Sequence, residues 1–257
     1  MKKRFLGVLL SVAMVAAVLA GCGSSGAKET AAPAGSETEA ASEAASGETE
    51  AASGETEAAG NTGDVITVGF SQVGAESDWR TANSESMKST FSTENGYNLI
   101  FDDAQQKQEN QIAAIRNFIQ QEVDYIVLAP VTESGWDTVL QEAKDAEIPV
   151  IIVDRMVDVS DDSLYTAWVG SNFKLEGQKA CEWLKQYAAA KNMSEVNIVD
   201  IQGTIGASAQ IGRTEALNEA VEANGWNLLA QQTGEFTQAK GQEVMESLLK
   251  KHGDDID

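Results

Sequence analysis

The chain has 257 residues and a formal net charge of −22, from 18 lysines and arginines against 40 aspartates and glutamates. No cluster of basic residues is present to neutralise phosphates, so the composition excludes nucleic acid as a partner. Such acidity suits a secreted and soluble protein, but it says nothing about the fold.

The first residues of the chain have the layout of an export signal. Cationic residues 2–4 precede an apolar run from Leu6 to Leu19, and Ala-Gly-Cys22 follows at once. This layout is typical of a secretory signal peptide, and the run is shorter than the roughly 20 apolar residues of a membrane span. The cysteine directly after Ala-Gly makes the segment resemble a bacterial lipobox, although an ordinary signal peptide with a chance cysteine is the alternative. The resemblance implies a lipoprotein signal peptide over residues 1–21 and acylation of Cys22.

Residues 22–63 are predicted to form a disordered acidic tether. After Cys22 they are mostly alanine, serine, glycine, threonine and glutamate, and residues 45–51 are repeated in 52–58. Without aromatic or large aliphatic side chains, the segment buries too little apolar surface to offset its ordering entropy. A tether of this kind after a lipobox resembles Gram-positive lipoproteins, which implies anchoring to the outer face of the cell membrane.

From residue 64 onward, short β-branched runs alternate with amphipathic helical patterns. The predicted strands are residues 65–70, 98–101, 124–129, 149–153, a weak 164–169, 196–201 and 226–231. The predicted helices include residues 79–95 with Gly96 as C-cap, 175–190, 207–223 and 238–251, and further helical faces contain Ile115 and Trp136. This alternation predicts an α/β fold of doubly wound parallel sheets with right-handed crossovers.

The pattern predicts two lobes, residues 64–170 and residues 171–257. The second contains only two strand–helix units, and residues 254–257 resemble the lead into another strand. We therefore expect an incomplete second lobe, low stability, and little or no ligand binding by the 257-residue chain.

The chain lacks the motifs of common enzyme classes. It contains no dinucleotide-binding glycine pattern after the first strand, no P-loop and no nucleophile elbow, and His252 is its single histidine. Triad or zinc chemistry needs more, so we expect no enzyme activity, no cofactor and no metal. Cys181 lies within a helical pattern and is predicted to be a small buried hydrophobe without a disulfide.

Side chains suited to a small ligand follow several predicted strands. In an open parallel sheet, ligands bind beyond the carboxyl ends of the strands. Carboxylates and guanidinium groups offer paired hydrogen bonds to adjacent hydroxyls, and aromatic rings offer flat apolar faces. Alone, Asp154 and Arg155 also read as a local ion pair and Trp79 as a core residue; their joint placement is what predicts a site.

Several segments in the same order resemble the ribose-type periplasmic sugar-binding proteins, and most of all their galactofuranose-binding branch. The segments are residues 68–74, 103–111, 129–131, 144–150, 154–155 and 202–208. The resemblance implies a type I periplasmic binding fold, with two lobes that close on a monosaccharide about a hinge. It implies sugar contacts from Ser71, Glu76, Trp79, Arg80, Asp154, Arg155, Arg213 and Phe236. Ribose binders have two consecutive aromatics near the first loop, whereas here Asp78 precedes Trp79, which favours the galactofuranose-like branch.

The family further implies the solute-binding subunit of an ABC importer, with permease and ATPase subunits as partners. A receptor that presents its sugar to a sensory membrane protein remains the alternative, because nothing in the chain separates the two. A transcriptional effector domain of the same fold is disfavoured by the signal peptide and by the missing helix-turn-helix.

Overall fold

The computed structural model describes residues 65–257. The signal peptide, the acylated Cys22 and the tether of residues 22–63 lie outside the described residues and stay predictions. Within 65–257, no helix combines the length and the apolar character that a membrane crossing requires.

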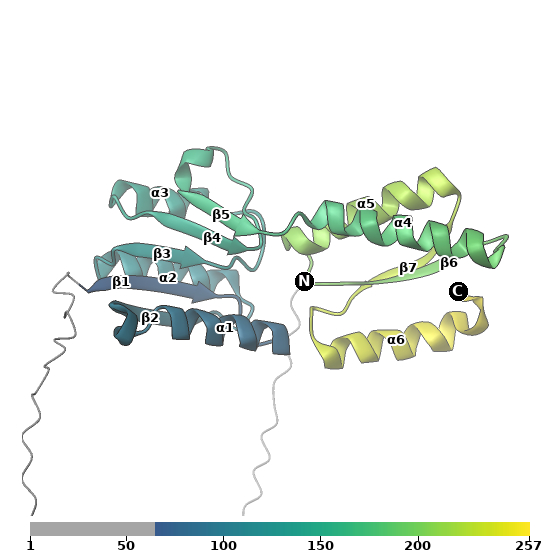
Figure 1. Ribbon diagram of the computed structural model, residues 1–257, viewed down its shortest axis with the longest axis horizontal. Helices are drawn as coiled ribbons and strands as arrows, with labels where there is room; N and C mark the ends of the chain where they lie inside the picture. Colours follow the sequence, from purple (N-terminus) through teal and green to yellow (C-terminus); the bar gives the residue numbers. More distant parts are fainter. Residues whose placement is uncertain (1–64) are drawn as a thin grey trace, which may run out of the picture. The chain divides into compact units, whose positions relative to one another are not determined.

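A five-stranded parallel sheet forms the first lobe (Figure 1). Its strands are β1 (Ile66–Gln72), β2 (Tyr97–Asp103), β3 (Tyr125–Leu128), β4 (Val150–Asp154) and β5 (Ala167–Gly170), in the order β2-β1-β3-β4-β5. Every strand predicted in this half of the chain is present, with its ends shifted by a few residues. The order is that of a doubly wound sheet, and it confirms the predicted fold class.

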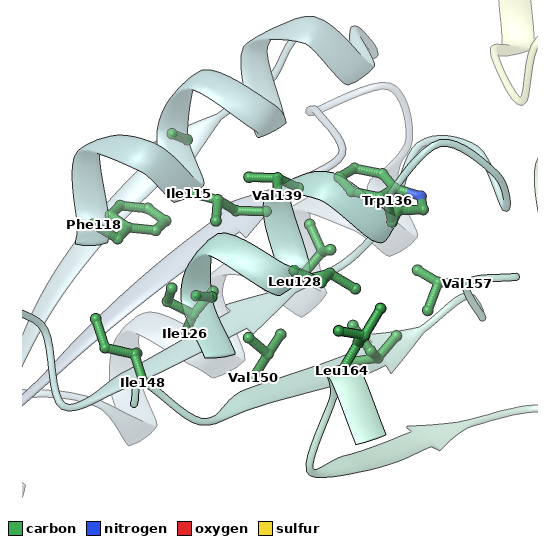
Figure 2. Close-up of a cluster of buried hydrophobic side chains, with 14 of the residues drawn as sticks. Ile115, Phe118, Ile126, Leu128, Trp136, Val139, Ile148, Val150, Val157 and Leu164 are labelled. Carbon is green, nitrogen blue, oxygen red and sulfur yellow. The ribbon is translucent and has the colours of Figure 1, made fainter. Parts of the chain in front are cut away.

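Three helices cover the two faces of this sheet. Met87 and Phe91, at the end of α1 (Asp78–Thr90), pack on one face, and α2 (Gln108–Gln120) and α3 (Asp137–Asp145) pack on the other. Figure 2 shows the second of these cores, where Phe118 of α2, Val139 of α3 and Leu128 of β3 belong to one buried cluster. Burial of these side chains is what the helical spacing of apolar residues predicts.

The prediction of one helix over residues 79–95 is wrong. The helix α1 ends at Thr90, and Thr93–Asn95 form a separate 3₁₀ turn that Gly96 closes at φ 85°. The Phe91 ring packs edge-on against Tyr97, with ring centres 5.2 Å apart. This contact turns the chain inward ahead of β2, so the α-helix cannot continue to residue 95.

The second lobe has a smaller sheet, with α4 (Phe173–Lys191) and α5 (Ser208–Asn224) on one side and α6 (Gln238–His252) on the other (Figure 1). Its two described strands, β6 (Asn197–Gln202) and β7 (Asn227–Thr233), are parallel. All of these elements correspond to predicted ones.

The end of the described chain differs from the prediction. Gly253–Asp255 form a 3₁₀ turn, so extended backbone begins only at Ile256. The backbone N–H of Asp257 then donates to the carbonyl of Asn197, at 3.1 Å, beside the start of β6.

Candidate functional site

Residues of both lobes line one cavity of about 330 Å³. They come from the β1–α1 loop and the first turn of α1, the end of β4, the β5–α4 loop and the start of α4, the helix α5 and the β7–α6 loop. The lining residues are Glu76, Ser77, Trp79, Arg80, Asp154, Arg155, Ser171, Phe173, Glu176, Ala209, Arg213 and Phe236. The volume lies within the roughly 300–1,000 Å³ of ordinary small-molecule sites.

Two buried arginines and two carboxylates form the first-lobe wall. The Arg80 guanidinium donates from Nη2 to Asp154, at 2.8 Å, and from Nε to Glu76, at 3.3 Å. The Arg155 guanidinium lies 3.8 Å from Glu76 and 4.0 Å from Asp154. Arg80 is 2% exposed and Arg155 is 3% exposed, so both charges are held in fixed positions away from bulk water.

The environment of Arg155 perturbs its acidity. Burial, and then the nearby charge of Arg80, lower the pKa of Arg155 to about 10, although Asp154 and Glu76 act in the opposite direction. The group therefore stays charged at neutral pH. Charged groups that are desolvated and crowded by a like charge are common at functional sites and uncommon elsewhere.

The second lobe adds a third arginine–carboxylate pair. Both the Nε and Nη2 groups of Arg213, on α5, donate to Glu176, on α4, at 3.1 and 2.8 Å. The two helices approach closely at Gly177, where a Cβ atom would lie 2.7 Å from the Ala216 side chain. A glycine at this position therefore allows the pair to form across the two helices.

Each of the three arginines also faces an aromatic ring. The guanidinium carbon lies 4.7 Å from the ring centre of Trp79 for Arg80, and 4.8 Å from that of Phe236 for Arg155. Arg213 lies 5.0 Å from the ring centre of Phe173. These are cation–π distances, and they align the flat guanidinium groups with the aromatic faces. Trp79 is 57% exposed, so its ring is available to a ligand.

Unusual backbone conformations aim two of these side chains. Asp154 ends β4 at φ 63°, a left-handed conformation that is uncommon for a residue with a Cβ atom. Gly170, its partner on β5, has no room for a side chain beside the Asp154 carbonyl. Phe236 also has a positive φ, of 57°, and its ring lies where a side chain of Gly203 would be. Strain of this kind tends to gather at binding sites.

The structure brings together seven of the eight residues named from the sequence, namely Glu76, Trp79, Arg80, Asp154, Arg155, Arg213 and Phe236. Ser71 is absent from the cavity lining; it is 0% exposed, and its Oγ has no hydrogen-bond partner among the described residues. The reason is that β1 continues to Gln72, two residues beyond its predicted end, so Ser71 lies inside the strand.

Sequence reasoning missed Phe173 and Glu176, which line the cavity from the first turn of α4. The sequence predicted that this helix begins at residue 175, and it placed the candidate site residues in segments that follow strands. One signal was present: Asn172 is a strong N-cap residue, and its side chain accepts from the N–H of Leu175 at 2.9 Å. Reading it as a cap would have placed Phe173 and Glu176 at the helix start, next to the lobe junction.

Two hydrogen bonds join the lobes beside the cavity. The N–H of Glu133 donates to the carbonyl of Gly206 at 2.7 Å, and the N–H of Met156 donates to the Oγ of Ser208 at 2.8 Å. No group of three or more potential metal ligands occurs within residues 65–257. Cys181 is buried, as predicted, and burial raises the pKa of its thiol.

A doubly wound parallel lobe, followed by a second strand–helix lobe and a polar cavity between them, defines a two-lobed α/β binding protein. Residues 68–257 match the periplasmic binding protein domain, and the chain belongs to this family. Its fold is therefore the type I periplasmic binding fold.

Three relatives illustrate the likeness. The galactofuranose-binding protein YtfQ of Escherichia coli K12 is 48% identical over 186 residues, which cover 72% of this chain and 57% of the relative. A Mycobacterium smegmatis protein solved with β-D-fucofuranose is 48% identical, with a TM-score of 0.70 and coverage of 75% and 62%. The arabinose-transporter binding protein of Shewanella sp. ANA-3, solved with L-arabinofuranose, is 49% identical, with a TM-score of 0.67 and coverage of 74% and 61%.

The Escherichia coli and Shewanella relatives are binding proteins by name, and none of the three is named as an enzyme. The chain spans 57% of the length of the curated relative and about three fifths of the solved chains.

Proposed function

We propose that the cavity binds a neutral monosaccharide, a galactofuranose-like hexose or a pentose, between the two lobes. The observation that carries the proposal is the composition of the lining: three arginines, three carboxylates and exposed aromatic surface, contributed by both lobes. Paired donors and acceptors suit neighbouring hydroxyl groups, and flat rings suit the C–H face of a sugar.

The charge balance of the cavity favours a ligand without charge. Glu76 and Asp154 face Arg80 and Arg155 within 4.0 Å, and Glu176 faces Arg213 at 2.8 Å. Every positive charge in the lining therefore already has a carboxylate partner. A uronate or sugar phosphate would bring an anion without a free cation to receive it, and its desolvation would go uncompensated.

We further propose that the protein is the lipid-anchored solute-binding subunit of an ABC sugar importer, held outside the membrane by Cys22. Sugar would stabilise a closed arrangement because it contacts groups on both lobes, and that form would dock on the permease. One relative supports transport, since it is the binding component of an arabinose ABC transporter. The three relatives do not favour the sensory alternative.

A ligand-observed NMR titration of the 257-residue chain tests the sugar proposal. The panel contains L-arabinose and D-galactose as their natural mixtures of ring forms, with D-glucuronate as a charged sugar. The sequence alone predicts little or no binding by this chain. Because residues of both lobes line the cavity, we instead expect saturation transfer to the neutral sugars, with a weak affinity near the millimolar range, about −4 kcal/mol. The absence of transfer to every neutral sugar at 20 mM, about twenty times that dissociation constant, would refute the proposal.

Variants assign the signal to the cavity. Arg155→Ala and Trp79→Ala are expected to abolish the transfer, because one removes buried donors and the other removes the exposed ring. Trp183→Ala is the matched control, since Trp183 is 62% exposed on α4 and does not line the cavity. Equal loss in all three variants would mean that the signal is non-specific.

A further inference from the structure

We infer that Gln72 is a positioning residue, which fixes the orientation of Arg80 and so determines the N–H groups that this arginine presents to the sugar. Gln72 does not line the cavity, and it lies at the carboxyl end of β1, behind Arg80. The inference rests on the proposed sugar-binding function.

The Gln72 amide is fully buried and fully hydrogen-bonded. Its Oε1 accepts from Nη1 of Arg80, at 3.2 Å, and from the N–H of Val73, at 3.0 Å. Its Nε2 donates to Oδ1 of Asn83, at 2.8 Å, and to Oγ of Ser84, at 3.1 Å. A glutamine amide has two donor hydrogens and an oxygen with two lone pairs, so all four positions are used.

These partners fix the polarity of the amide. Exchanging its oxygen and nitrogen would set an NH₂ group against two donors, the Arg80 guanidinium and the Val73 N–H. It would also set the amide oxygen against the accepting oxygen of Asn83. Because the residue is 0% exposed, no water is available to compensate, and the oxygen must face Arg80.

Arg80 is therefore held on three sides. Gln72 takes one hydrogen of Nη1, Asp154 takes one of Nη2, and Glu76 takes the hydrogen of Nε. A guanidinium has five N–H donors, so two remain after the hydrogen bonds to described residues, one on each terminal nitrogen. Donors on both terminal nitrogens allow a guanidinium to bond to two neighbouring oxygens of a ligand. Loss of the Gln72 acceptor would leave Nη1 without a partner among the described residues and allow the guanidinium to tilt about its bonds to Glu76 and Asp154.

Two substitutions separate positioning from packing. Gln72→Met keeps an unbranched side chain of similar length but removes the acceptor. Gln72→Glu keeps an acceptor for Arg80 and strengthens it with charge, although it loses the donors to Asn83 and Ser84. Val139→Ala is the stability control, since Val139 is 1% exposed in the core beneath α3, away from the cavity lining.

The experiment measures the affinity of each variant for L-arabinose by the same NMR titration at pH 7, with circular dichroism to check folding. We expect Gln72→Met to bind about tenfold more weakly than the wild type, the scale of one hydrogen bond to a charged group. Gln72→Glu should recover most of this loss, and Val139→Ala should lower the stability with less than a twofold change in affinity.

A pH series gives a second, independent reading. The recovery in Gln72→Glu should disappear as the new carboxylate becomes protonated, toward about pH 4, whereas a packing role predicts no such dependence. This reading holds even if Gln72→Met fails to fold.

The outcomes are distinguishable. Wild-type affinity in a folded Gln72→Met, or a Gln72→Glu affinity whose ratio to wild type does not change with pH, overturns the inference and leaves sugar binding intact. Failure of the wild type to bind any neutral sugar overturns the proposed function, and the inference with it.

Discussion

The two lobes differ sharply in how deeply their strands are buried. In β1, five of the seven residues are buried, whereas none of the six residues of β6 is. Both clusters of buried apolar side chains in the described chain lie within residues 68–164. The buried residues of the second lobe are mostly small, and Phe173, Val196, Val244 and Leu248 are the larger ones among them.

The arginine side chains of the cavity differ in burial in the same way. The side chains of Arg80 and Arg155, from the first lobe, are 3% and 4% exposed, whereas that of Arg213, from the second, is 47% exposed. The first lobe therefore presents donors that are already oriented, and the second presents a group that is still free to adjust. Pre-oriented groups lose less entropy on binding, so the first lobe should contribute most to the selectivity of the proposed sugar site.

The largest expected effect on stability comes from comparing a buried tryptophan of the first lobe with an exposed tryptophan of the second. Trp136 is 0% exposed and its Nε1–H donates to the carbonyl of Thr132 at 2.8 Å, whereas Trp183 is 62% exposed. We expect Trp136→Ala to lower the free energy of unfolding by about 3–5 kcal/mol, and Trp183→Ala to change it by less than about 0.5 kcal/mol. Urea unfolding followed by circular dichroism measures both. Similar losses would mean that the second lobe is as tightly packed as the first.

Alanine substitutions at two glycines, one in each lobe, are expected to change the stability in opposite directions. A Cβ at Gly69, on β1, would lie 2.5 Å from the Phe118 ring, whereas at Gly241, on α6, it would meet nothing within 4 Å. We expect Gly69→Ala to cost about 1–3 kcal/mol through overpacking. Gly241→Ala should instead stabilise the helix by up to about 1 kcal/mol. The same denaturation assay decides, and a stabilising Gly69→Ala would contradict the tight packing of β1 against α2.

Amide hydrogen exchange compares the sheets directly. Deeply buried strands exchange only through large openings, whereas weakly covered strands exchange through local ones. We expect the amides of Phe70 and Val127 to exchange at least about tenfold more slowly than those of Val199 and Leu228. Mass spectrometry or NMR gives the rates. Uniform protection across both sheets would show that the lobes open as one unit.

The smallest expected effect concerns a half-buried carboxyl group on β2. Burial, and then the neighbouring Asp103, raises the pKa of Asp102 above its ordinary value of 3.8, and its Oδ1 has no partner among the described residues. A carboxyl group whose pKa is higher in the folded state than in the unfolded state stabilises the fold while it is protonated. This contribution is present at low pH and is lost as the pH rises through the pKa of the folded state. We therefore expect the wild type to lose stability relative to Asp102→Asn between about pH 4 and pH 7. Urea midpoints at the two pH values check this, and a constant difference would argue against titration of Asp102.

Much of the fold followed from local pattern. All seven predicted strands are present. A short apolar run of strand length indicates a buried strand, whichever sheet it joins. Element ends were less predictable, as the break of α1 at Phe91 shows, since a ring contact with Tyr97 decided it. The position of Ser71 outside the cavity lining has the same origin: hydrogen bonds to the neighbouring strands extend β1 to Gln72, and these cannot be read from the sequence of β1 alone.

The sequence by itself determined the class of the protein and most of the cavity, because ligand-facing residues follow parallel strands and can be read from strand ends. Only the tertiary structure paired Arg80 with Asp154, Arg155 with Phe236 and Arg213 with Glu176, and only it placed Gln72 behind Arg80. Those relations join residues far apart in the chain, such as Arg80 and Asp154, and they depend on the left-handed backbone at Asp154 and the space left by Gly203. No local pattern encodes such distances, because packing sets them.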